Sequence, residues 1–91
     1  NLYKIERDLF KNLNNLKRLN LNQNLIKKID SFYYLDSLVY LSLSNNFISI
    51  FVLEGDDLQN LTELDLSENN YLIEIYIKKK YKLESININN N

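Results

Sequence analysis

Leucine and isoleucine recur along this chain at fixed distances, in the pattern Leu-x-x-Leu-x-Leu-x-x-Asn. Its four copies are Leu16, Leu19, Leu21 and Asn24; Leu38, Leu41, Leu43 and Asn46; Leu61, Leu64, Leu66 and Asn69; and Leu83, Ile86, Ile88 and Asn91. They begin at residues 16, 38, 61 and 83, so the spacings are 22, 23 and 22 residues. A period of this length indicates stacked structural units.

Within each copy, apolar and polar side chains alternate, as at 19–22 and 64–67. Alternation with period two is typical of a strand with one buried face. A single short strand cannot bury that face, so we expect successive strands to lie in parallel about 4.8 Å apart. Each leucine then covers its counterpart in the next unit, and the stack itself forms the core.

An asparagine closes every copy, at Asn24, Asn46, Asn69 and Asn91. The chain must bend inward after each strand, and the bend removes backbone N–H and C=O groups from water. An amide side chain carries both donors and an acceptor, so it can satisfy both kinds of group. The four positions predict a structural asparagine ladder.

The segments between the copies supply a second set of apolar residues, which we expect to line the convex side: Ile26, Ile29, Phe32, Leu35, Ile48, Phe51 and Leu58. Two irregularities interrupt them. Gly55 lies between acidic residues and suggests a turn with positive φ or an outward loop. Leu72 follows Asn69 one residue later than the pattern requires, which predicts a local bulge.

This pattern resembles the leucine-rich repeat family over essentially the whole chain. The resemblance implies an α/β-type repeat solenoid, a right-handed superhelix with a concave parallel sheet of short strands and a mostly irregular or short-helical convex side. The units would be 1–15 (partial, its strand preceding residue 1), 16–37, 38–60, 61–82 and 83–91 (partial). Such proteins bind proteins or microbial products, outside or inside cells. The sequence leaves the compartment open, with an extracellular or cell-surface location favoured over the cytoplasm.

Polar residues at equivalent strand positions should form columns on the concave face. The predicted binding residues are Arg18, Tyr40 and Glu63 in one column and Asn20, Ser42 and Asp65 in the next. This surface changes from basic to aromatic to acidic, which favours a protein partner, and Tyr and Arg are common interface anchors. The alternative is a structural spacer or dimerisation segment of a larger protein whose ligand site lies elsewhere. Ends without caps would also allow homo-association.

Composition argues against other functions. With 11 Lys+Arg against 12 Asp+Glu, the net charge of −1 provides no field for nucleic acid, and no apolar run is long enough to enter a membrane. Cys and His are absent, so we expect no enzyme activity, no catalytic residue and no cofactor. The acidic residues Glu54, Asp56 and Asp57 lack an EF-hand spacing, and we expect a polar loop there without a metal.

Three further motifs have ordinary explanations. The basic cluster of Lys78, Lys79, Lys80 and Lys82 is expected to be a solvated face, with a phosphate-binding patch as the alternative. Asn60 begins an Asn-Leu-Thr triplet, a weak N-glycosylation signal in a chain so rich in asparagine. Five tyrosines are expected to cover convex packing edges: Tyr33, Tyr34, Tyr71, Tyr76 and Tyr81.

Overall fold

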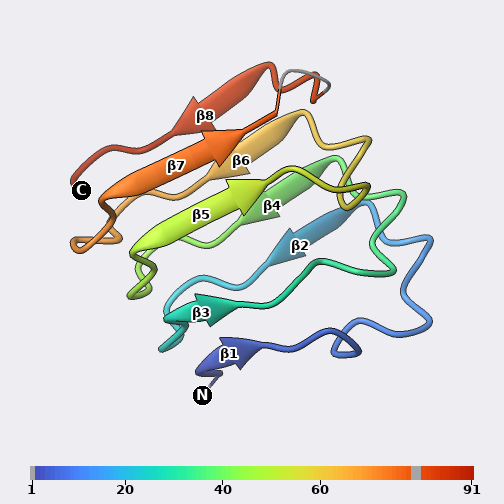
Figure 1. Ribbon diagram of the computed structural model, residues 1–91, viewed down its shortest axis with the longest axis horizontal. Helices are drawn as coiled ribbons and strands as arrows, with labels where there is room; N and C mark the ends of the chain where they lie inside the picture. Colours follow the sequence, from blue (N-terminus) through green and yellow to red (C-terminus); the bar gives the residue numbers. More distant parts are fainter. Residues whose placement is uncertain (1, 79–80) are drawn as a thin grey trace.

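Four short parallel strands lie side by side along one face of the computed structural model (Figure 1). They are β2 (Arg18–Asn20), β4 (Tyr40–Ser42), β6 (Glu63–Asp65) and β8 (Ser85–Asn87). Their register places Leu19, Leu41, Leu64 and Ile86 opposite one another. This is the predicted side-by-side stack, and the fold class inferred from the repeat is confirmed.

The structure describes residues 2–78 and 81–91. Lys79 and Lys80 of the basic cluster therefore lie outside the described residues, and the cluster stays a prediction. In the described ranges no helix is long and apolar enough to cross a membrane.

Short strands also occupy the convex side, where the sequence predicts mostly irregular or short-helical chain. They are β1 (Lys4–Ile5), β3 (Lys28–Ile29), β5 (Ile50–Leu53) and β7 (Glu74–Ile77). β1 pairs with β3 and β5 pairs with β7, both in parallel, but β3 and β5 do not pair. The ladder on this side is thus interrupted once, and the described residues contain no helix.

The core fills the space between the two sides. Leu41, Leu43, Leu64 and Leu66 enter it from the concave strands and the turns that follow them, and all four are at most 2% exposed. The convex side contributes Ile5, Ile26, Phe32, Leu35, Ile48, Phe51, Leu53 and Leu58, which are also buried. Burying each such side chain contributes about 1.5–3 kcal/mol, so the stacked aliphatic residues supply most of the stabilisation.

Each ladder asparagine links its own turn to the neighbouring unit. The Asn46 Nδ2 group donates to the Leu43 and Leu21 carbonyl oxygens, both at 3.0 Å, and Asn46 Oδ1 accepts from the Ile26 N–H at 3.1 Å. Asn69 repeats this arrangement one unit further along, with Leu66, Leu43 and Ile48 as its partners. Both asparagines are buried, so these bonds satisfy groups that water cannot reach.

The residue before each ladder asparagine has a left-handed backbone. These residues are Gln23, Asn45, Glu68 and Asn90, with φ between 56° and 61°. A second set consists of Asn12, Tyr34 and Leu58. For Gly55 the sequence suggests a positive φ or an outward loop, and the first alternative is wrong. The positive φ of this segment is at Leu58, three residues later, whose side chain is buried.

The bulge predicted after Asn69 is present. Ile29 and Phe51 follow their ladder asparagines by five residues, whereas Ile75 follows Asn69 by six, yet Phe51 and Ile75 pair in register. A turn closed by the Leu72 N–H and the Asn69 carbonyl, 2.9 Å apart, accommodates the extra residue.

Candidate functional site: the concave face

The concave face is formed by the outward side chains of β2, β4, β6 and β8. Strand register brings Arg18, Tyr40 and Glu63 into one row, as the sequence predicts. The Arg18 guanidinium carbon lies 4.1 Å from the centroid of the Tyr40 ring, which is within range of a cation–π interaction. Arg18 and Glu63 are exposed and Tyr40 is half-buried, so this row is open to a partner.

A shallow depression of about 170 Å³ lies on the far side of Tyr40 from Arg18. Its lining residues are Tyr40, Glu63, Leu64, Asp65, Ser85 and Asn87. Small-molecule sites usually measure about 300–1,000 Å³, so this hollow suits a single protruding side chain better than a complete ligand. The side chain of Leu64 points into the core, so the hollow is bordered mainly by the Tyr40 ring and by polar side chains, among them the carboxylates of Glu63 and Asp65.

The second predicted column has a structural task. Asn20 Oδ1 accepts from the Asn22 N–H at 2.8 Å, and Asp65 Oδ1 accepts from the Ser67 N–H at 2.9 Å. Asn87 makes the same bond to Asn89, at 3.0 Å. These side chains close the backbone where each strand ends, which orients them but leaves Asn20 exposed and Asp65 partly exposed.

Ser42 is the exception in this column, and it requires a correction. Its exposed fraction is 0%, so it cannot contact a partner directly as we had expected. Its hydroxyl donates to Asn22 Oδ1 at 2.6 Å, and the same oxygen accepts from the Ser44 N–H at 2.8 Å. Because Ser42 is short, the neighbouring Asn22 side chain covers it, and Ser42 helps to fix the turn after β2.

The acidic loop and Asn60 are both tied to the neighbouring unit. Asp57 Oδ2 accepts from the Phe32 N–H at 3.0 Å, and Asn60 Nδ2 donates to the Asp36 carbonyl at 2.6 Å. Among the residues that the structure describes, no three His, Cys, Asp or Glu side chains are placed to hold a metal ion. Glycosylation of the exposed Asn60 stays a prediction.

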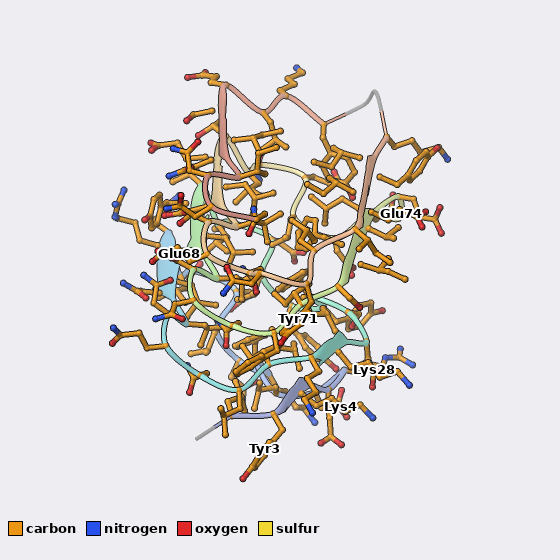
Figure 2. The ribbon with its side chains drawn as sticks, turned by 90° about the vertical axis from the view of Figure 1, so that its left-hand side faces the viewer. Tyr3, Lys4, Lys28, Glu68, Tyr71 and Glu74 are labelled. Carbon is orange, nitrogen blue, oxygen red and sulfur yellow. The ribbon has the colours of Figure 1, made fainter. Side chains whose placement is uncertain are left out.

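Two larger open hollows lie away from the concave face. One, of about 650 Å³, follows the interruption between β3 and β5. The other, of about 570 Å³, lies on the lateral edge formed by the ladder turns and is lined by Tyr3, Leu25, Lys27, Phe47 and Tyr71. Figure 2 looks onto this edge, with Tyr71 near its centre and Tyr3 at its lower end.

Sequence reasoning missed the lateral aromatic edge. Tyr71 is 66% exposed and stacks on Phe47, with ring centroids 6.4 Å apart, so it does not cover a packing edge as expected. Leu25 and Phe47 directly follow ladder asparagines, and Tyr71 follows Asn69 after one further residue. Comparing the residues that follow the ladder asparagines in successive units would have revealed this edge from the sequence. Neither larger hollow contains the arginine–tyrosine pair or the two carboxylates of the concave face.

Comparison with known proteins identifies the repeat. The family model described as "Leucine rich repeat" matches residues 1–48, and that described as "Leucine Rich repeats (2 copies)" matches residues 36–80. A "Probable glycoprotein hormone G-protein coupled receptor" of Anthopleura elegantissima is 44% identical over 70 residues, which cover 71% of this chain. The match spans only 8% of the receptor's length. No significant match to a solved structure was found.

Proposed function

The chain belongs to the leucine-rich repeat family, and we propose that it recognises a protein partner through the concave face. The family acts generally in protein interactions and is typically non-enzymatic. The observation that supports this particular face is the stacked Arg18–Tyr40 pair beside Glu63, since strand register places the three residues in one row. The face is open rather than enclosed, which suits a macromolecule.

Physical reasons favour this pair as the anchor. Arg and Tyr are enriched among the residues that contribute most to binding. Stacking already restricts both side chains before a partner arrives, so less side-chain entropy is lost on binding. The strands beneath them rest on the fully buried Leu41 and nearly buried Leu64, which gives the pair a rigid support.

The similarity to a receptor supports a cell-surface location for this module. That protein is named as a receptor, and we propose accordingly that this chain is part of a cell-surface protein. The competing proposal is a spacer or dimerisation segment, in which the concave residues are only solvated. The two differ in whether concave substitutions change binding.

Selection from a random peptide library against the 91-residue chain tests the concave proposal. Arg18→Ala and Tyr40→Ala should each weaken the selected peptides by about tenfold or more, since anchor residues are worth roughly 1.4 kcal/mol or more. Affinity would be measured by calorimetry at concentrations where the chain is monomeric, with circular dichroism to establish that both variants fold.

Matched controls lie elsewhere on the chain. Arg7→Ala removes a second cation–π contact, that of Arg7 with Tyr33 at 4.7 Å, and Tyr76→Ala removes an exposed tyrosine of β7. Both should leave affinity unchanged within about twofold. Full affinity in Arg18→Ala and Tyr40→Ala would refute the concave proposal and favour the competing proposal of a spacer or dimerisation segment. A loss confined to Tyr71→Ala would move the binding site to the lateral edge.

A further inference from the structure

Charge on the concave face is separated by strand. Lys17 and Arg18 are exposed at the start of β2, Tyr40 occupies β4, and Glu63 and Asp65 lie on β6. The remaining polar residues of the depression, Ser85 and Asn87, are uncharged. Within the described residues the ion pair formed is Lys4 with Asp30, far from this face, so neither carboxylate is neutralised by a cation of the chain itself.

This depression has the chemistry of a receptor for a cation. Two carboxylates and the polar atoms of Ser85 and Asn87 can accept hydrogen bonds from an ammonium or guanidinium group. Tyr40 adds an aromatic wall, which attracts cations and repels anions. Arg18 approaches Tyr40 from β2 and does not line the hollow, so the site is not filled by the chain's own cation.

Spacing restricts the shape of the partner. β2 and β6 are separated by two strand steps, or about 10 Å. Residues i and i+7 of an α-helix share one face and lie about 10.5 Å apart. An extended strand places same-face residues at roughly 7 or 13 Å, so neither of its spacings matches. The residue spacing of a helix therefore matches the distance between the basic β2 and the acidic β6 better than that of an extended strand.

We propose that the occupant of the concave face is a helical segment of a protein partner that carries a basic residue and an acidic residue seven positions apart. The basic side chain enters the depression beside Tyr40, between Glu63 and Asp65, and the acidic one pairs with Arg18. An apolar residue of the partner helix, located between the basic and the acidic residue on the same helix face, packs over the Tyr40 ring. This inference rests on the proposed function, since it specifies the partner of the same face.

The test repeats the peptide selection with a library of alanine-rich helices whose exposed face is randomised. Selected helices should contain Lys or Arg seven residues from Glu or Asp, in either order along the helix. Replacing the basic residue of a selected helix by alanine, or Glu63 of the chain by glutamine, should weaken binding about three- to tenfold. The loss should shrink at high salt, because exposed charges are screened.

Glu74→Gln is the matched control. It makes the same chemical change on the opposite side of the solenoid (Figure 2), and it should alter affinity by less than about twofold. The reversal Glu63→Lys should shift the selection toward acidic residues at the corresponding position. A melting curve of each variant separates loss of binding from loss of fold.

The outcomes distinguish the two proposals. Helices that depend on Tyr40 but tolerate loss of their basic residue, and that bind Glu63→Gln unchanged, overturn the charge assignment and leave the concave site intact. Helices indifferent to Tyr40→Ala overturn both. If the selected helices instead carry their basic and acidic residues three or four positions apart, the proposed match between the helix spacing and the distance from β2 to β6 is wrong. Failure to select any binder counts against both proposals.

Discussion

At the scale of single residues, the asparagines account for the regularity of the stack. Asn46 is 4% exposed and its side-chain amide serves three carbonyls and one N–H, drawn from its own turn and from the preceding unit. No other small side chain has two donor hydrogens and an acceptor oxygen in this geometry. The amide therefore joins units as well as closing a turn.

Replacing Asn46 by alanine should lower the free energy of unfolding by about 1–3 kcal/mol, because the buried Ile26 N–H would lose its acceptor. The Leu43 carbonyl would keep its bond from Asn69. Urea denaturation of the two proteins measures the difference. Asn70→Ala is the control, since Asn70 is exposed and should change stability by no more than about 0.5 kcal/mol. Equal losses in the two variants would contradict the structural role of Asn46.

The same scale shows what a sequence pattern can predict. Alternation placed Arg18, Tyr40 and Glu63 in one row, because register follows from the period alone. It could not show that Ser42 is buried or that Asn20 and Asp65 bind backbone N–H groups. Those outcomes depend on the size and rotamer of the neighbouring side chain, here Asn22 over Ser42, and period-two spacing contains no information about either.

At the scale of elements, the convex strands were the least predictable feature. β5 reads Ile-Phe-Val-Leu, and its continuous apolar run does not show which face is buried. In the structure Phe51 and Leu53 point into the core while Ile50 and Val52 remain 50% and 43% exposed. Pairing of β5 with β7 but not with β3 follows from the relative positions of whole units, which no local pattern specifies.

The loop after β5 is held from both sides. The Asp57 carboxylate accepts from the Phe32 N–H of the preceding unit, at 3.0 Å. The Tyr81 hydroxyl lies 2.6 Å from the Asp57 carbonyl oxygen and 2.9 Å from that of Gly55, and its one proton is shared between them. Tyr81 is only 8% exposed, so it joins the core and the loop instead of simply covering an edge.

Tyr81→Phe should reduce the free energy of unfolding by about 0.5–1.5 kcal/mol, the usual net value of one hydrogen bond, while the ring keeps its packing. Hydrogen exchange should accelerate first in the 54–58 loop, because the loop loses its link to the following unit. Tyr76→Phe provides the control, since Tyr76 is 47% exposed. Unchanged exchange in the loop of Tyr81→Phe would show that the two carbonyl contacts contribute nothing.

At the scale of the whole molecule, burial depends on having a neighbour on each side. Leu41 and Leu64, with strands on both sides, are at most 2% exposed, whereas Ile86 in the last strand and Ile88 just after it are 45% and 49% exposed. β2 and β8 are the edges of the four-stranded sheet, and each offers unpaired backbone groups to any strand that approaches. A repeat stack thus carries its least satisfied surface at its two ends.

The 91-residue chain on its own should therefore associate end to end. We expect sedimentation to show a mass that rises with concentration, and a melting temperature that rises with it, since association stabilises the folded form by mass action. Ile88→Lys should shift the chain toward monomer, because a charge just after β8, on the exposed end of the stack, opposes stacking. Ile73→Lys changes an isoleucine that is 82% exposed and directly precedes β7, and it should leave association unaltered. A monomeric, cooperative melt independent of concentration would mean that the exposed isoleucines and open strand edges are too small a surface to bind a second copy.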